Sequence, residues 1–256
     1  CVLFRSSISP IDFFHQLRRR ALVHIQTHFP NPMRHYMTGL LFGYLDKEFD
    51  EQSQLYTSLG IIHLFALSGM QVGFFLGWFR YGLLRLGLPK NYILAILLPF
   101  SIFYGLMTGW TASVLRSLIQ SLLAECGIKK LNNMGITLLL LFLVLPHFLL
   151  TVGGVLSCSY AFLLCLFDFE ERPSFKKSIY MSLILSLGTL PFLTYYYGTF
   201  QPLSLILTAI FSLVFDSFLL PILTVLFTLS GLVIFSQINP LFEWMETFLT
   251  WIQSWI

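Results

Sequence analysis

The amino-acid sequence predicts an all-α fold: a polytopic transmembrane helix bundle of about seven spans, with kinked or re-entrant helices and an amphipathic interfacial helix at each end. Hydrophobic residues make up 56% of the 256 residues and charged residues only 11%, against roughly 25% in a soluble domain. The few charges are clustered, and the long runs between them are apolar. Because about 18–20 apolar residues are enough to cross a bilayer, lipid is the expected solvent.

Residues 10–29 are predicted to form an amphipathic surface helix. Ser9 suits the N-cap position and Pro10 the first helical position. Apolar residues recur at helical spacing, and Arg18–Arg20 join the polar side. A basic helix of this kind is typical of the membrane interface. The polar stretch 46–54 is predicted to be a solvated loop.

Apolar runs predict the successive spans at 59–80, 92–107, 111–124, 134–145, 151–167, 178–195 and 202–235. Several runs are close to the minimum length of about 17 residues. The pairs 92–124 and 134–167 are therefore either two crossings each or re-entrant hairpins buried in protein. The last run is long for one crossing, and Pro221 is expected to divide it.

Lysine and arginine residues predict the orientation of the spans. They gather in the loops 80–90, 127–133 and 170–177, whereas the turns near 109, 147 and 198 carry none. Such an asymmetry marks the basic side as cytoplasmic in a multi-pass protein. The N-terminal helix is then expected on the outer side.

The tail, residues 238–256, places Trp244, Trp251 and Trp255 near one helical face. This pattern predicts an interfacial helix with an aromatic anchor, and a last short crossing is the alternative. The chain is thus divided into an external helix with its linker (1–35), a transmembrane domain (36–237) and the interfacial tail. Because it begins with Cys1 and has no signal-peptide pattern, we expect a piece of a longer protein.

No phosphate-binding loop, paired-histidine metal motif or nucleophile elbow occurs in the sequence. We therefore expect no catalytic residue, metal or cofactor in this segment. The informative residues are the polar ones inside apolar runs, because a charge at the bilayer centre costs from about 2.5 to more than 10 kcal/mol. Arg116 and Asp216 both lie midway along such runs. They are interpreted either as a structural ion pair or as the lining of a pathway, and Ser113, Ser117 and Gln120 share the face of Arg116.

The run 63–73, His-Leu-Phe-Ala-Leu-Ser-Gly-Met-Gln-Val-Gly, is unusually polar for the first span. His63 and Gln71 are predicted to lie on roughly one side of a helix. Gly69 and Gly73 form a GxxxG pair, which predicts close helix packing.

Three motifs resemble those of the ComEC-type competence membrane domain. They are the run 63–73, the run 106–116 (Leu-Met-Thr-Gly-Trp-Thr-Ala-Ser-Val-Leu-Arg) and the run 189–200, which contains Pro191 and Gly198. Pro221 fits the family as well. This sequence has Gln71 where the family more often has His, Thr111 and Ala112 in place of Ser-Pro, and Thr208 in place of Asn.

The resemblance implies a channel that conducts single-stranded DNA across the bacterial cell membrane into the cytoplasm during natural transformation. The implied channel lining consists of His63, Ser68, Gln71, Thr108, Trp110, Ser113, Arg116 and Gln120. The implied helix-packing residues are Gly69, Gly73, Pro191, Gly198 and Pro221. The expected partners are single-stranded DNA, membrane lipid and other competence proteins, namely an external DNA receptor and a cytoplasmic helicase or strand-binding proteins. Any hydrolase activity would belong to flanking domains, and a homo-oligomer stays open.

Two other interpretations remain. The chain could be a secondary transporter of a small solute that uses a buried Arg116 and Asp216 site. It could also be a structural anchor for catalytic flanks, although the buried polar residues argue against pure anchoring.

Overall fold

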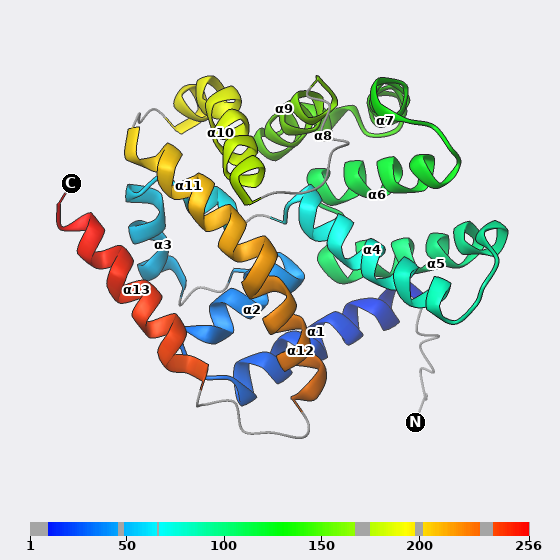
Figure 1. Cartoon of the computed structure of the whole chain (residues 1–256). Coiled ribbons are helices and arrows are strands. Elements are labelled where there is room, and N and C mark those ends of the chain that lie inside the picture. Colours follow the sequence, from blue (N-terminus) through cyan, green and yellow to red (C-terminus); the bar gives the residue numbers. More distant parts are fainter. Residues whose placement is uncertain are drawn as a thin grey trace, which may run out of the picture.

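A computed structural model of the chain describes residues 10–45, 49–65, 67–166, 175–197, 202–230 and 238–255. All regular secondary structure in these ranges is helical, as the sequence predicts (Figure 1). The elements are α1 (Pro10–His28), α2 (Met33–Phe42), α3 (Phe49–Ser58), the 3₁₀ turn η1 (Ile62–Phe65), α4 (Gly69–Arg85), α5 (Lys90–Thr108), α6 (Ala112–Glu125), α7 (Lys130–Val144), α8 (Pro146–Leu150), α9 (Val152–Leu166), α10 (Phe175–Tyr197), α11 (Pro202–Val214), the π-helical turn η2 (Phe215–Leu219), α12 (Leu220–Leu229) and α13 (Asn239–Gln253).

The first hydrophobic core joins the two ends of the chain. It packs side chains of α1, α2, α3 and η1 against α11, η2, α12 and α13. Tyr36, Phe65 and Phe215 lie at its centre with their rings in contact. Figure 1 shows the orange α11 and α12 crossing the front of the molecule, with α2 and α1 behind them and α13 along one edge.

A second, smaller core joins α4, α5 and α6. Its centre consists of buried side chains from each helix, including Val72, Ile93 and Val114. The remaining helices α7, α9 and α10 form an outer layer at the side of α6 and α11 (Figure 1). Their outward side chains are large and apolar, for example Phe142 and Leu143. That exposure is typical of a surface covered by lipid or protein.

The structure identifies helices that are long and apolar enough to cross a membrane. By length and composition two apolar segments among the described residues qualify: Ile206–Leu229, which is continuous helix, and Ile62–Arg85, in which α4 begins only at Gly69. Four shorter apolar segments are Tyr92–Thr108, Lys130–Val144, Val152–Leu166 and Leu183–Phe192. The apolar runs of the sequence are therefore helices, and the number of crossings stays a prediction.

The prediction of a solvated loop at residues 46–54 is wrong for the part of the segment that the structure describes. From Phe49 onward the chain forms α3, and residues 46–48 lie outside the described part. Phe49 and Tyr56 are seven residues apart, so they share one helical face, and both are buried in the first core. The burial of this apolar face stabilises α3 as a helix packed on the core, although most of its residues are polar.

The run 63–73 does not form one continuous helix. Residues 62–65 form a 3₁₀ turn, and α4 begins only at Gly69. Ser68 caps α4, because its Oγ accepts the N–H of Gln71 at 3.3 Å while its own N–H donates to Gln71 Oε1 at 2.8 Å. This reciprocal capping box stops the helix from extending back to His63. The prediction that His63 and Gln71 share one helical face is therefore wrong.

Pro221 does not interrupt the last apolar run. Helical backbone continues from α11 through η2 into α12. A proline has no N–H and its ring crowds the carbonyl one turn earlier. The wider π turn at 215–219 lies where that crowding falls, so the chain passes the proline without a break.

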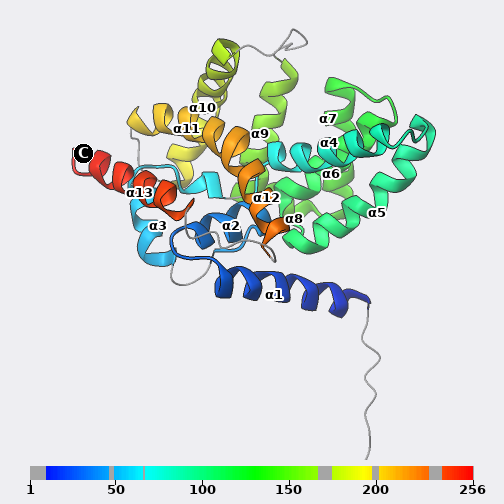
Figure 2. The same ribbon diagram turned by 60° about the horizontal axis from the view of Figure 1, so that its bottom comes forward.

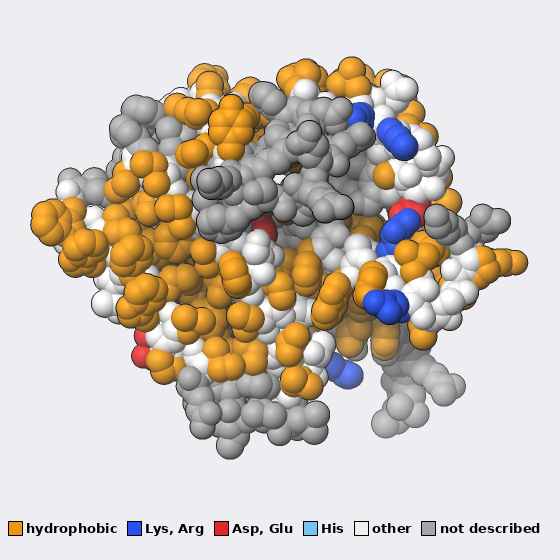
Figure 3. Space-filling model, viewed as in Figure 1, with side chains coloured by type: hydrophobic (Ala, Val, Ile, Leu, Met, Phe, Trp, Pro, Cys, Tyr) orange, Lys and Arg blue, Asp and Glu red, His pale blue; other side chains and the backbone are white. Residues whose placement is uncertain are grey.

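The two terminal helices are amphipathic, as predicted, but their apolar faces are used differently. The apolar face of α1 lies against the bundle, where Ile25 and Phe29 are buried. In α13, Phe242, Met245 and Leu249 pack inward, while the outer face carries the stacked rings of Trp244, Phe248 and Trp251. Only α13 therefore presents an aromatic surface suited to a membrane interface. Figure 3 shows hydrophobic side chains covering the face formed by α11, α12 and α13.

Gly69 and Gly73 of α4 differ in their surroundings. A Cβ atom on Gly69 would lie 2.6 Å from Arg116 Nη2 and 2.7 Å from Ser117 Oγ. Gly73 is exposed, and no described atom lies within 4 Å of a Cβ placed there. The predicted GxxxG contact is therefore present at Gly69 and absent at Gly73 within the described residues.

We predict that Gly69→Ala lowers the thermal stability of the protein in detergent, and that Gly73→Ala does not. The added methyl at Gly69 displaces the Arg116 guanidinium, and overpacking of this kind costs about 1–3 kcal/mol. At Gly73 an alanine meets no neighbour and favours the helix by up to about 1 kcal/mol. Equal unfolding temperatures for the two variants would contradict the close approach at Gly69.

A buried polar contact fastens α13 to the first core. The hydroxyl groups of Tyr36 and Tyr56 are hydrogen-bonded at 2.5 Å, and Glu246 of α13 is hydrogen-bonded to Tyr56. Burial raises the pKa of Glu246 to about 7, while its hydrogen bond with Tyr56 opposes the rise. The folded protein therefore prefers the neutral carboxyl group at this position.

We predict that the stability of the protein falls as the pH rises through about 7, in part because of Glu246. A raised folded-state pKa means that the stabilisation is complete below the unfolded value and is lost as the carboxyl group ionises inside the fold. Glu246→Gln should reduce this pH dependence, measured as unfolding temperature between about pH 5 and pH 8. Glu243→Gln removes a neighbouring charge that raises the pKa of Glu246, so it should keep this pH dependence in a weaker form. An unchanged pH profile in Glu246→Gln would show that the carboxyl group is not responsible.

Candidate functional site

The candidate site is built around Arg116, which lies on α6 one turn after the helix begins. A tight turn joins α5 to α6, with Gly109 and Trp110 both at positive φ (85° and 54°). The Trp110 ring packs directly on Gly105, where a Cβ atom would lie only 2.6 Å from it. Thr108 Oγ1 donates to the carbonyl of Tyr104 at 2.8 Å and is buried. These contacts fix the start of α6 and so the position of Arg116.

The Arg116 side chain is 6% exposed and makes three side-chain hydrogen bonds. Its Nε donates to Ser157 Oγ of α9 at 2.8 Å. Its Nη2 donates to Ser117 Oγ at 2.9 Å, and its Nη1 donates to Gln120 Oε1. All three partners are neutral, so the hydrogen bonds solvate the guanidinium group without cancelling its charge.

The start of α4 closes the site from another side. Gly69 leaves room for the guanidinium group and for Ser117. The chain before the helix is tied to α6, because Ser113 Oγ donates to the carbonyl of Leu67. Ser117 Oγ in turn donates to the carbonyl of Ser113 at 2.8 Å. Residues of one face of α6 therefore both bind the non-helical chain before α4, through Ser113, and carry the buried Arg116.

The helix α7 supports the far end of the site. Asn133 Nδ2 donates to the carbonyl of Gln120 at 2.8 Å, and Gln120 Nε2 lies 3.0 Å from Met134 Sδ. Gln120 therefore links Arg116 to α7, while Ser157 links it to α9. Helical spacing predicts Gln120 beside Arg116 but does not predict Ser157 or Asn133. Ser157 lies in a separate apolar run and Asn133 at the end of the basic loop 127–133, and no local spacing points from either residue to Arg116.

The structure contradicts the ion pair between Arg116 and Asp216. A salt bridge does join Arg80 to Glu125, at 2.6 Å and partly exposed, but it lies at other positions of the chain. Asp216 lies instead in the π-helical turn of the last apolar run, half-buried. In the part of the chain that the structure describes, Arg116 has no carboxylate partner.

The other predicted channel residues lie apart from this cluster. Ser68 and Gln71 satisfy each other in the capping box, and Gln71 is only 1% exposed. Thr108 and Trp110 belong to the turn before α6. His63 lies in η1, and its Nε2 atom is buried without a hydrogen-bond partner among the described residues.

Of the predicted packing residues, Pro191 lies inside α10 with its ring exposed, and Pro221 follows the π turn. Gly198 lies outside the described residues, as do Ser9 and residues 170–174 of the third basic loop. The described residues contain no group of three or more His, Cys, Asp or Glu side chains that could hold a metal ion.

Comparisons with known proteins place this site in a family. A family model described as "Competence protein" matches residues 40–256. ComE operon protein 3 of Bacillus subtilis (strain 168) is 28% identical over 216 residues, which covers 78% of this chain and 28% of that protein. The chain therefore spans little more than a quarter of that relative. No solved structure matches the chain. Because the family model runs from the last turn of α2 through α13 and includes the whole Arg116 cluster, the chain belongs to the Competence protein family.

Proposed function

We propose that this chain is the membrane-embedded part of a DNA-uptake machine and that it conducts single-stranded DNA into the cytoplasm. The family match supports a role in competence, and one structural observation carries the more specific proposal. Arg116 is a permanent cation, buried where α4, α6 and α9 meet, and its partners among the described residues are neutral. A site of this kind is complementary to a phosphate group.

The charge of Arg116 supports the proposal because a buried guanidinium group cannot lose its proton to escape the cost of burial. Neutral hydroxyl and amide groups lower that cost but leave an electrostatic potential favourable to anions. A purely structural arginine would gain more from a carboxylate partner. A transient phosphate of the moving strand would provide the missing negative charge.

The side chains around Arg116 suit weak and repeated binding. Ser113, Ser117, Ser157 and Gln120 are small or flexible polar groups that can exchange partners. Conduction requires sites that bind weakly enough for release, and one arginine among serines meets that condition. Because Arg116 is buried, the proposed path is closed in this structure. Passage of a strand would require α9 to separate from α6, which breaks the bond between Arg116 and Ser157.

We assign the roughly seven crossings and the orientation to the same proposal. The basic loops 80–90, 127–133 and 170–177 would face the cytoplasm of a bacterium. The position of α1 supports this arrangement, because Arg18 packs against Gly109 at the opposite, uncharged end of α5 and α6. Figure 2 shows α1 lying across one end of the bundle.

The whole protein would need partners that this chain does not contain. We propose an external DNA receptor and a cytoplasmic helicase or strand-binding protein, with membrane lipid around the bundle. We assign no catalysis to this segment, and any hydrolase would lie in flanking domains.

Secondary transport of a small solute is the second candidate, and Asp216 is the observation in its favour. π-helical turns inside α-helices often occur at functional sites, and Asp216 is an acid within an apolar run. Because Asp216 and Arg116 do not pair, this candidate needs two separate sites. The single cluster around Arg116 therefore favours the DNA channel.

We predict that Arg116→Ala abolishes DNA transport in transformation assays and leaves capture of DNA at the cell surface intact. Arg116→Lys should keep partial activity, because a point charge still attracts phosphate. Arg85→Gln, an exposed arginine at the other end of the bundle, is the matched control and should transport normally.

Membrane levels of each variant must be measured alongside transport. If Arg116 served structure alone, its variants would lose transport only in proportion to their loss of membrane level. Normal transformation by Arg116→Ala at the wild-type membrane level would refute the channel role of Arg116. Transport that depended on Asp216 and not on Arg116 would favour the solute transporter.

A further inference from the structure

The helix α1 has an exposed basic face whose purpose the channel proposal leaves unexplained. It precedes the region that the family model matches. Its apolar face is already used, because Ile25 and Phe29 are buried in the first core and Phe14 packs against Phe103 of α5. An amphipathic helix that binds a membrane inserts its apolar face among the lipids. In α1 that face lies against the protein itself.

The outward face of α1 combines cations with polar and aromatic groups. Arg19, Arg20 and His28 are exposed, and no acidic residue occurs between Phe13 and His28. Arg18 is not part of this face, because its Nη2 donates inward to the carbonyl of Phe42 at 3.2 Å. The exposed face therefore carries positive charge with no acidic side chain of its own beyond the first turn.

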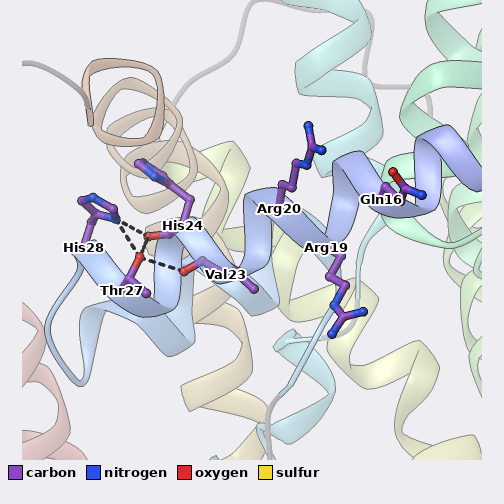
Figure 4. Close-up of a pocket in the computed structure, with 7 residues that line it drawn as sticks. All are labelled: Gln16, Arg19, Arg20, Val23, His24, Thr27 and His28. Atoms are coloured by element: carbon purple, nitrogen blue, oxygen red, sulfur yellow. Dashed lines mark hydrogen bonds between the residues drawn. The ribbon is translucent and has the colours of Figure 1, made fainter.

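A shallow surface pocket of about 410 Å³ lies along this face, lined by Gln16, Arg19, Arg20, Val23, His24, Thr27 and His28. In Figure 4, Arg19 and Arg20 point to opposite sides of α1, so the two guanidinium groups flank the exposed surface. The rings of His24 and His28 are stacked, with centroids 4.2 Å apart. His24 Nε2 is fixed 2.8 Å from Ser230 Oγ at the end of α12, which holds the stacked pair in place.

We propose that this face of α1 binds the sugar-phosphate backbone of a single DNA strand before the strand reaches the bundle. The identity of the strand rests on the proposed function. Paired guanidinium groups neutralise phosphates, and flat rings such as His28 and the exposed Phe13 provide stacking surfaces for bases. Anionic lipid headgroups share the phosphate chemistry, but lipid would leave the fixed histidine stack without a partner. The cations and rings extend from Phe13 to His28, along about 24 Å of helix at 1.5 Å per residue, and this length suits a linear polymer.

The test measures binding by the purified chain in detergent micelles, and it does not depend on transport. A fluorescent 20-nucleotide oligodeoxythymidylate is titrated by anisotropy against the wild type, Arg19→Gln/Arg20→Gln and the control Arg85→Gln. We expect the double variant to bind roughly 2- to 30-fold more weakly, as for the loss of two exposed ion pairs. Its plot of log affinity against log salt should be shallower by about 1.4, at 0.7 for each phosphate contact. Arg85→Gln, which removes an exposed arginine far from α1, should bind like the wild type.

Two outcomes would overturn the inference. One is equal affinity and equal salt dependence in the wild type and the double variant. The other uses dihexanoyl-phosphatidylglycerol, a soluble anionic lipid, as a second probe. The inference fails if the double variant loses affinity for this lipid and keeps its affinity for the oligonucleotide. Either outcome leaves the channel proposal standing, because that proposal depends on transport through Arg116. Conversely, normal transport by the Arg116 variants would refute the channel role without changing the binding result for α1.

Discussion

The burial of one permanent charge, Arg116, is the constraint on which the arrangement around the site depends. A guanidinium group inside an apolar bundle must be surrounded by hydrogen-bond acceptors. Those acceptors come from α6 itself and from α9, while α7 holds Gln120 in place. The same requirement explains why α4 begins with glycine, since any side chain at Gly69 would occupy the volume of the guanidinium group.

The first hydrophobic core stabilises the fold, and the candidate functional site lies outside it. The first joins the beginning and the end of the chain through large aromatic side chains and contains little that could move without a high cost. The Arg116 cluster lies outside it, where α6 meets the thinner outer layer of α7 and α9. Among the described residues neither hydrophobic core includes a side chain of α7 or α9, so we expect these helices to separate more easily than helices held by a buried aromatic core. A path for a polymer is therefore best located at this boundary, and the basic face of α1 lies at the end of the bundle from which we expect the strand to arrive.

Much of the fold could be predicted from the sequence, because apolar runs mark most of the helices directly, although Pro221 lies within continuous helix and does not divide it. The exceptions have physical causes. The composition of α3 is polar, but Phe49 and Tyr56 anchor it in the first core. The capping box at Ser68 makes α4 begin at Gly69, whereas the apolar composition alone predicts an earlier start. At the site, helical spacing identified Ser117 and Gln120 as neighbours of Arg116. Ser157 could not be found in this way, because contacts between distant segments leave no periodic signal, and the expected partner Asp216 lies elsewhere in the fold.

The most direct test of the central claim is photo-crosslinking during uptake. A photoreactive amino acid is placed at Ser157, which touches Arg116 across the boundary between α6 and α9, and at Leu143 on the exposed side of α7 as a comparison. Cells then take up a labelled DNA strand under illumination. The account predicts that the strand crosslinks at position 157 and not at position 143. Uptake that proceeds while the strand never crosslinks at position 157 would contradict a path past Arg116.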